Sequence, residues 1–342
     1  MKKILHLSPS IFDKGGISQV CYEYKYYSND FYFVTTTLKG NILLKLSIFI
    51  KAIAECVYFF LLRKVNIVHI HTASNISFKR KTIFIYLAKL FKVKVVLHIH
   101  GGKFKIFFQK HPYLIRHILN QKVDVVIALS NSWKTFFEQQ CGCNNVVVLN
   151  NPIPIPDNTV TEKHTSLNIL FLGSLCKEKG IYDLLDVMIE LSIEKNNDII
   201  LYIAGIGDVK KLQMIISENN LYDTVKYEGW VEGENKINLL RNSDILILPS
   251  YIEGLPLCIL EGMSYKKAII ATNVGAIPEI IDNKSGILFH PGDKAALKEA
   301  IMYLYYNPEK CKMFGENGYY ISKSFWTESV QSDLFKIYNQ LR

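Results

Sequence analysis

Short apolar runs alternate with longer amphipathic stretches along the whole chain. Runs of this kind are typical of strands buried on both faces of a parallel sheet, and the stretches between them have the length of helices. The predicted strands lie at 3–8, 31–36, 67–71, 93–100, 123–129, 145–150, 167–174, 198–205, 224–230, 244–250, 268–273 and 285–290. The predicted helices lie at 41–64, 78–91, 132–140, 181–192, 209–219, 235–241 and 256–264. The pattern therefore predicts an α/β fold.

The stretch NNPIPIPD at 150–157 interrupts this pattern. It contains three prolines in five positions, and proline can continue neither a helix nor a central strand. We predict a doubly wound, Rossmann-like domain over 1–150, a linker over 151–157, a second such domain over 158–320, and a helical segment over 321–342 that could pack back on the first. Open α/β sheets bind ligands at the carboxyl ends of their strands, so we expect the two domains to face a central cleft.

The charge of the chain is divided unevenly. Residues 1–150 hold 21 Lys and Arg against 6 Asp and Glu, a net of +15, whereas residues 151–342 hold 19 against 25, a net of −6. A basic half indicates an anionic partner, such as a membrane surface, an acidic substrate or nucleic acid; the alternative is a solvated lysine-rich surface. No nucleic-acid-binding motif accompanies the basic residues, so we expect no nucleic acid. The seven scattered cysteines indicate reduced thiols and a cytoplasmic protein.

The apolar segment at 41–64 requires a membrane test. Lys45, Lys51 and Glu55 interrupt it, so it lacks the roughly 18 uncharged apolar residues of a spanning helix. At helical spacing Lys51, Glu55 and Arg63 share one broad arc with Lys45, which indicates an amphipathic helix. We interpret it as a helix packed on the core, with a membrane-surface helix as the alternative.

The stretch YIEGLPLCILEG carries the most specific chemistry. Glu253 lies just after the apolar run ILILPS, and Glu261 follows eight residues later. Because Pro256 suits the first turn of a helix, we predict a helix from Pro256 to Ser264. Helix N-termini attract phosphate, so a carboxylate on each side could bind the hydroxyls flanking a diphosphate, as in a nucleotide sugar. The alternative is an ordinary strand–loop–helix with a capping glutamate. The phosphate-binding amides would be those of Gly254, Leu255, Leu257 and Cys258.

Together with AIIATNVGAIPEII and GILFHPGD, this Glu-x7-Glu stretch resembles the retaining glycosyltransferases of family 4, which have the GT-B fold. The likeness covers nearly all of residues 167–300. It implies that Glu253 contacts the hydroxyls of the donor sugar as a catalytic residue, that Glu261 binds the ribose, and that Lys179 contacts the phosphates. The family commonly has an arginine where this chain has Ser174, so Lys179 and the helix terminus would carry more of the charge.

Two further loops are assigned by the same resemblance. IAGIGD and EGWVEG match the loops that hold the nucleotide base, with Gly205, Gly207 and Val231 lining the pocket. In the first half, Gly15 and Gly16 of DKGGIS match the glycine loop that closes on the diphosphate. From the residues alone, that stretch is equally a flexible glycine turn.

Histidines follow two predicted strands of the first half. Alternation puts His98 and His100 of LHIHGG on one face, with His100 nearest the carboxyl end. The resemblance implies that His100 is the family's active-site histidine. His69 and His71 repeat the pattern, and we interpret them as satisfied, partly buried side chains. Two such pairs could form a metal site, but no carboxylates join them, and the resemblance implies metal independence.

The resemblance as a whole implies a hexosyltransferase of class EC 2.4. It would move a sugar from a nucleotide diphosphate sugar to a glycan acceptor, expected to be lipid-linked, with retention of anomeric configuration and without a metal or other cofactor. Bacterial-type synthesis of O-antigen, capsule or exopolysaccharide is the expected context. The basic half would make peripheral contact with an anionic membrane at the inner face of the plasma membrane. The alternatives are a sugar-nucleotide 2-epimerase of the same architecture and a non-catalytic binder of anionic polymer or membrane.

Overall fold

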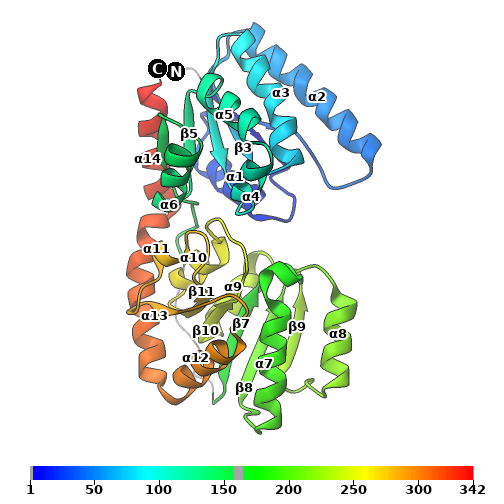
Figure 1. Ribbon diagram of the computed structural model, residues 1–342, viewed down its shortest axis with the longest axis vertical. Helices are drawn as coiled ribbons and strands as arrows, with labels where there is room; N and C mark the ends of the chain where they lie inside the picture. The colour runs from blue at the N-terminus through cyan, green and yellow to red at the C-terminus, as the bar shows by residue number, and fades with distance from the viewer. Residues whose placement is uncertain (1–2, 158–164, 342) are drawn as a thin grey trace. The chain divides into compact units, whose positions relative to one another are not determined.

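The computed structural model describes residues 3–157 and 165–341, and the chain divides into two compact units (Figure 1). Unit 1 comprises Met1–Pro154 and Phe325–Arg342, and unit 2 comprises Ile155–Ser324. Each unit is built on a six-stranded parallel sheet, as the buried apolar runs predict. The predicted start of the second domain at residue 158 lies outside the described residues.

The sheet of unit 1 has the strand order β2-β1-β3-β4-β5-β6. Its strands are β1 (Lys3–Ser8), β2 (Phe31–Thr35), β3 (Val65–Thr72), β4 (Lys94–Ile99), β5 (Val125–Ala128) and β6 (Val146–Val148). Its helices are α1 (Gly16–Tyr27), α2 (Ile42–Leu61), α3 (Ile76–Leu90), α4 (Phe104–Lys110), α5 (Pro112–Gln121), α6 (Asn131–Thr135), a π-helical turn at Phe136–Gln140, and α14 (Thr327–Gln340). The order reverses between β1 and β3, so the carboxyl ends of these two strands flank a topological switch point, where open sheets bind ligands.

The sheet of unit 2 has the strand order β12-β11-β10-β7-β8-β9. Its strands are β7 (Leu167–Leu172), β8 (Ile199–Ala204), β9 (Val225–Gly229), β10 (Ile245–Leu248), β11 (Ala268–Thr272) and β12 (Gly286–Phe289). Its helices are α7 (Ile181–Ile193), α8 (Val209–Glu218), α9 (Gly233–Arg241), α10 (Leu257–Ser264), α11 (Ile277–Ile280), α12 (Lys294–Tyr306) and α13 (Pro308–Ser322), with short 3₁₀ turns at Lys177–Lys179 and Lys323–Phe325. Here the switch point lies between β7 and β10.

All the strands predicted from the apolar runs are present, with ends shifted by one or two residues. The α/β prediction, with two doubly wound sheets, is therefore confirmed. Two local predictions need adjustment. Helix α10 begins at Leu257, with Pro256 as its extended N-cap, one residue later than predicted. The glycine stretch at 13–18 leads directly into α1, a 12-residue helix that, like α4, α5, α11, α12 and α13, was not among the predicted helices.

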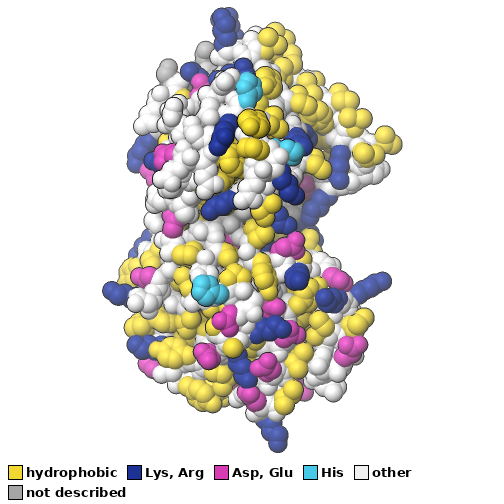
Figure 2. Space-filling view, in the orientation of Figure 1, with side chains coloured by type: hydrophobic (Ala, Val, Ile, Leu, Met, Phe, Trp, Pro, Cys, Tyr) yellow, Lys and Arg dark blue, Asp and Glu magenta, His cyan; other side chains and the backbone are white. Residues whose placement is uncertain are grey.

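The interpretation of α2 as a core-packed helix is wrong for most of its surface. Only Ala52, Cys56 and Phe60 are buried. The charged arc leaves a wide apolar face, and this face is exposed in unit 1, as the hydrophobic side chains over α2 in Figure 2 show. Its exposed apolar residues are Ile42, Leu43, Leu44, Leu46, Ile50, Tyr58 and Leu61. Among the described residues, no helix is long and apolar enough to cross a membrane.

Helix α14 returns the end of the chain to unit 1. Its inner side buries Val330, Leu334 and Tyr338, and Thr327 at its first turn donates a hydrogen bond to Glu23 on α1 (3.1 Å). Just ahead of it, Trp326 forms an isolated parallel bridge with Ile153. Contributions from both ends of the chain therefore complete the core of unit 1, and α14 places the phenol of Tyr338 inside it.

Candidate active site

Two loops at the switch point of unit 2 carry the predicted donor-binding residues. The loop after β7 ends in a 3₁₀ turn that carries Lys179, and the loop after β10 carries Glu253. Because β7 and β10 are neighbours in the sheet, their carboxyl ends bring these two side chains together. Both side chains therefore lie at the carboxyl edge of the parallel sheet, where the sequence placed Glu253.

Glu253 is held by two donors. Lys179 Nζ donates to Glu253 Oε1 at 2.5 Å, and the Ser250 hydroxyl donates to the same oxygen at 2.7 Å. Glu253 is 8% exposed, and the ammonium of Lys179 balances the charge of its carboxylate at close range. Burial alone would lower the pKa of Lys179, but the Glu253 carboxylate raises it above its usual value, so the lysine carries its charge. Both bonds use Oε1, which leaves Oε2 for a ligand hydroxyl.

Backbone packing fixes both loops. Gly180, directly after Lys179, has φ of 68°, and a Cβ there would lie 1.9 Å from the carbonyl oxygen of Pro249 at the end of β10. Gly275, in the loop after β11, also approaches the backbone of Glu253 closely, since a Cβ there would lie 2.4 Å from the Glu253 carbonyl oxygen. Only glycine permits these approaches. Gly180 and Gly275 thus fix the backbone of the two loops in the positions that allow Lys179 and Glu253 to contact each other.

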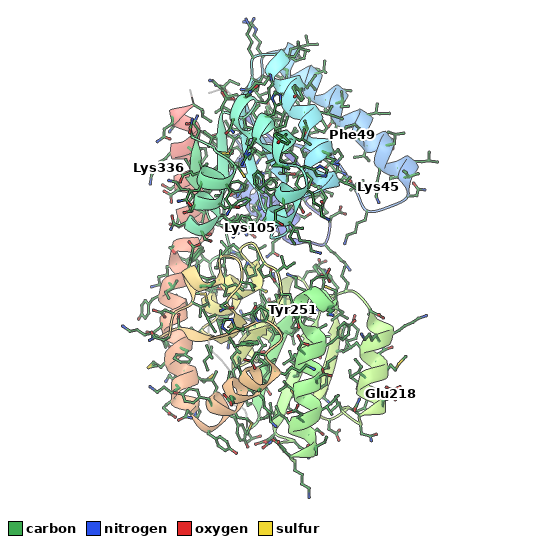
Figure 3. All side chains as sticks on the ribbon, viewed as in Figure 1. Lys45, Phe49, Lys105, Glu218, Tyr251 and Lys336 are labelled. Carbon is green, nitrogen blue, oxygen red and sulfur yellow. The ribbon has the colours of Figure 1, made fainter. Side chains whose placement is uncertain are left out.

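A third hydrogen bond ties Ser250 to the neighbouring strand. The Thr272 hydroxyl donates to the carbonyl of Ser250 (2.5 Å), and Tyr251, labelled in Figure 3, donates through its hydroxyl to Asp183 (2.7 Å). The residues before Glu253 are therefore braced from both sides. Sequence reasoning missed Ser250 and Thr272, because a serine and a threonine at strand ends carry no signal of their own.

Glu261 also has a lysine partner. Lys236 of α9 donates to Glu261 Oε1 at 2.7 Å, and the carboxylate is 5% exposed. Sequence reasoning missed Lys236, since nothing in its helix distinguishes it from a surface lysine. The two predicted carboxylates therefore lie in separate environments, each with its own cation, and do not form an acid–base pair.

The N-terminus of α10 lies between the two glutamates in sequence. Leu257 and Cys258 are its first helical residues, and the amides of a first helical turn have no acceptors within the helix. Its N-cap, Pro256, offers no side-chain cap, and its first turn contains no acidic residue. Burial and the Glu253 charge raise the pKa of Cys258 to about 12, so this thiol is neutral. Gly254 and Leu255, in the loop ahead of the helix, are buried. This end of α10 is suited to an anion.

The residues predicted to hold the base are only partly brought together. A Cβ at Gly205 would lie 1.8 Å from the carbonyl oxygen of Gly173, and one at Gly207 would lie 2.5 Å from that of Leu175, so backbone packing alone requires both glycines. Val231 instead lines an open pocket of about 570 Å³ with neighbours such as Trp230 and Asn235. A larger pocket of about 750 Å³ over α8 and β9 contains none of the predicted site residues.

In unit 1, Gly15 and Gly16 lie at the N-terminus of α1, on the loop that follows β1. Gly15 is the N-cap, both glycines are exposed, and the first turn has neither a side-chain cap nor an acidic residue. A Cβ at Gly15 would meet nothing within 4 Å. The loop thus presents open helix amides beside a switch point, which is the geometry that a phosphate-binding glycine loop requires.

The histidines of unit 1 form an unexpected arrangement, which we call the histidine chain. It consists of five imidazoles and one phenol linked end to end in the order His100, His71, His6, Tyr338, His69 and His98. In its first half, His71 Nδ1 lies 3.0 Å from His100 Nε2, and His71 Nε2 lies 3.0 Å from His6 Nδ1. The Asn151 side chain also interacts with the ring of His100 and acts to raise the pKa of that ring.

The second half of the histidine chain runs through α14. The Tyr338 hydroxyl lies 3.2 Å from His6 Nε2 and 2.5 Å from His69 Nδ1, and His69 Nε2 lies 3.3 Å from His98 Nδ1. All of these rings are fully buried. The prediction that His69 and His71 are satisfied side chains is confirmed, although they are fully rather than partly buried.

The rings of the histidine chain are neutral. Burial lowers the pKa of His6 to about 3, and burial together with the neighbouring imidazoles holds the pKa values of His69, His71 and His98 well below the usual range. Burial also lowers the pKa of the partly exposed His100 to about 3, although its interaction with Asn151 acts in the opposite direction. Ligand atoms of His6, His69 and His71, and of His71, His98 and His100, lie within 4.8 Å of one another. These triads could reach a metal ion, but most of their nitrogens are already hydrogen-bonded within the histidine chain.

Comparisons with known proteins agree with this geometry. A model of the family described as "Glycosyl transferases group 1" matches residues 157–320, which contain the whole unit 2 site. An uncharacterized glycosyltransferase of Methanocaldococcus jannaschii is 28% identical over 306 residues, which are 83% of this chain and 78% of the relative. The part of the chain that carries the unit 2 site is therefore similar to group 1 glycosyltransferases, and most of the chain is similar to this archaeal relative.

Two further proteins extend the comparison. The poly(ribitol-phosphate) alpha-N-acetylglucosaminyltransferase of Staphylococcus aureus is 26% identical over 243 residues, covering 68% of this chain and 47% of that enzyme. The structure of HepE from Anabaena, solved in complex with UDP, matches 99% of this chain and 100% of HepE with a TM-score of 0.80 and 18% identity. At that identity the structural likeness supports the fold.

Proposed function

We propose that this glycosyltransferase is a hexosyltransferase that moves a sugar from a nucleotide diphosphate sugar to a lipid-linked glycan acceptor, with retention, in the synthesis of a bacterial cell-surface polysaccharide. The contact between Lys179 and Glu253 at the switch point carries the proposal. It joins a cation suited to phosphate to a carboxylate suited to sugar hydroxyls, beside the N-terminus of α10.

The charges of the site suit a donor diphosphate without a metal ion. Lys179 has three N–H donors and gives one to Glu253, so two remain for phosphate oxygens. The carboxylates that would otherwise attract a divalent cation are already paired, Glu253 with Lys179 and Glu261 with Lys236. Stabilisation of the departing diphosphate by Lys179 and the α10 amides would then be the main catalytic contribution.

Each glutamate has a separate task in this proposal. Glu253 would orient the sugar through its unused oxygen, and Glu261 would hold the ribose. Neither needs to act as a base, because the leaving diphosphate can accept the proton of the acceptor hydroxyl that attacks on the same face. Attack on that face gives retention. Gly15 and Gly16 of unit 1 would contact the diphosphate, and His100 would contact the sugar.

Ligand-induced stabilisation tests donor binding. A thermal-shift panel of UDP-, GDP- and dTDP-sugars should contain at least one that stabilises the protein, by about 2.7 kcal/mol at a hundredfold excess over Kd. Lys179→Ala should abolish this shift. Lys298→Ala is the matched control, because Lys298 also bridges carboxylates in unit 2, those of Glu190 and Glu194, but lies on the exposed side of α12. No stabilisation by any donor would contradict the proposal.

A second measurement separates transfer from the rival chemistry. With the stabilising donor and a lipid-diphosphate-linked glycan as acceptor, the protein should release the nucleoside diphosphate and extend the acceptor. Glu253→Gln should lower kcat by about a hundredfold, as expected for loss of a positioned charged contact, with the fold retained. Epimerisation of the donor in the absence of acceptor would favour the epimerase instead.

The exposed face of α2 supports peripheral attachment at the inner face of the plasma membrane. Ile42, Leu43 and Leu46 are 81%, 72% and 53% exposed. Lys45, labelled in Figure 3, lies between Leu43 and Leu46 in the sequence, and Lys51 follows on the same helix. Apolar side chains bordered by lysines suit an anionic bilayer. The net charge of +15 over residues 1–150 has the complementary sign.

Vesicle binding tests this attachment. Replacing Ile42, Leu43 and Leu46 by serine should weaken binding to phosphatidylglycerol-containing vesicles by at least about tenfold, since full burial of each side chain is worth about 1.5–3 kcal/mol. Met214→Ser, at a 56% exposed apolar position on α8 of unit 2, is the control and should change nothing. Equal binding of wild type to purely zwitterionic vesicles would contradict the role of the lysines.

A further inference from the structure

The unbroken series of hydrogen bonds in the histidine chain constrains where its protons lie. A neutral imidazole donates one hydrogen bond and accepts one, and a phenol has one proton to donate. With every internal nitrogen bonded to a neighbour, the protons must all point the same way along the chain. The rings therefore all carry the proton on Nδ1 or all carry it on Nε2. A third arrangement, in which His6 and His69 both donate to Tyr338, leaves a buried phenol proton without an acceptor.

The far end of the histidine chain distinguishes the two directions. His98 Nε2 is fully buried and has no hydrogen-bond partner. If every ring carries its proton on Nε2 (the Nε2–H direction), His98 Nε2 is a buried N–H donor without an acceptor. If every ring carries its proton on Nδ1 (the Nδ1–H direction), His98 Nε2 is only an acceptor without a donor. Orphaned buried N–H groups are the rarer of the two in proteins. The Nδ1–H direction is therefore favoured, and His71 Nδ1 then donates to His100 Nε2.

We propose that the histidine chain is a positioning device that holds His100 as a neutral ring in its Nδ1–H form, with His71 as the residue that fixes it. This proposal rests on the proposed function, in which His100 contacts the donor sugar. His71 occupies the Nε2 lone pair of His100 at 3.0 Å, so this nitrogen cannot serve as a base. The orientation of the ring is set from inside the core by this contact.

The bonds of His71 suggest a matched pair of variants. The amide nitrogen of asparagine reaches about as far as Nδ1 of histidine, and that of glutamine about as far as Nε2. His71→Asn thus keeps a donor toward His100 and loses the contact to His6, whereas His71→Gln keeps a group toward His6 and loses the donor toward His100. A role in packing alone would make the two variants similar.

Kinetics give the first readout. We expect His71→Asn to retain kcat within about threefold of wild type, the size of one net hydrogen bond, and His71→Gln to lower it by about tenfold or more through misplacement of His100. Tyr338→Phe keeps the bond between His71 and His100 but removes the link that imposes a common direction. It serves as the second variant if the His71 substitutions do not fold. Equal kcat values for the two His71 variants would overturn the positioning role.

Nitrogen-15 NMR of labelled histidines gives a readout that does not depend on activity. His100→Ala identifies the His100 signals, which should show protonated Nδ1 and unprotonated Nε2 in wild type and in His71→Asn, and a mixture of tautomers in Tyr338→Phe. Protonated Nε2 in wild type, or one equivalent of bound metal in the purified protein, would overturn the proposal. If the Nδ1–H form is seen but no donor stabilises the protein, the proposed function fails while the direction of the histidine chain stands.

Discussion

Unit 1 should lose stability as the pH falls from 7 to 5. Its core contains imidazoles that stay neutral in this pH range while the protein is folded and become protonated when it unfolds. The rings of His6, His69, His71 and His98 are fully buried, and burial depresses each pKa far below the unfolded value of about 6.5. The unfolded chain therefore binds more protons below pH 6.5. Stability is fully present above that pH and falls until the folded pKa is reached, which is about 3 for His6.

The magnitude follows from linkage. Between pH 7 and pH 5 the free energy of unfolding falls by about 2 kcal/mol for each ring that stays neutral in the folded state. For the four fully buried rings the decrease is about 8 kcal/mol. That is comparable to the whole stability of a typical domain, about 5–15 kcal/mol. At about 2 kcal/mol per molar of urea, it corresponds to a fall of about 4 M in the unfolding midpoint.

Tryptophan fluorescence can isolate this transition. The chain has three tryptophans, and Trp133 and Trp326 belong to unit 1. In a Trp230→Phe background the signal reports unit 1 alone. Adding His98→Leu should reduce the loss between pH 7 and pH 5 by about 2 kcal/mol, because one proton fewer is taken up on unfolding. His117→Gln, at an exposed position, should leave the loss unchanged.

A urea midpoint that is the same at pH 5 and pH 7 would refute the reasoning, since it would mean that the rings are hydrated or already charged in the folded state. A large loss that His98→Leu does not reduce would be equally damaging, because it would assign the protons to other groups.

Two further substitutions test the packing around the sites. Gly180→Ala should destabilise unit 2 by about 2–4 kcal/mol in urea unfolding, because its Cβ would lie 1.9 Å from the Pro249 carbonyl at a φ of 68°, and it should weaken donor binding by moving the loop. Tyr338→Phe should cost unit 1 about 2–4 kcal/mol in the same assay, since it leaves buried nitrogens of His6 and His69 unsatisfied. A loss below about 0.5 kcal/mol in either case would contradict the corresponding contact.

The strands could be predicted from sequence because each is a continuous apolar run between polar segments, and a run buried on both faces has few other solutions. Helix α1 was missed because its residues GISQVCYEYKYY follow two glycines and show only a weak apolar stripe. The apolar face of α2 was visible in the pattern, but the sequence does not reveal whether another element covers such a face. Ala52, Cys56 and Phe60 are covered, whereas Leu43 is not.

The candidate site shows a similar division. Glu253 and Glu261 could be selected from sequence because their spacing places them on either side of a predicted helix start, and Lys179 because the family resemblance implies it. Lys236 could not, because its contact with Glu261 depends on how α9 packs beside α10. Alternation placed His98 and His100 on one face of β4.

Joining those rings to His6 and Tyr338 required two facts that the sequence does not state. One is the strand order β1-β3-β4, which aligns His6 with His69 in the sheet register and His71 with His98. The other is the return of α14 to unit 1, which brings in the phenol. Local periodicity fixes which face a ring takes, whereas the hydrogen-bonded order of the rings comes only from long-range packing.

The family resemblance leads us to expect an arginine at position 174, and the lysine at the switch point explains how a phosphate site could function with Ser174 instead. An arginine presents a rigid fork of donors, whereas the ammonium of Lys179 has three donors around one atom. One of these already holds Glu253, which fixes the ammonium beside the N-terminus of α10 before any ligand arrives. A diphosphate would then meet a preformed charge and the first amides of the helix. If this reasoning holds, Ser174→Arg should improve donor affinity by no more than about tenfold, and a larger gain would show that Lys179 alone is an incomplete phosphate site.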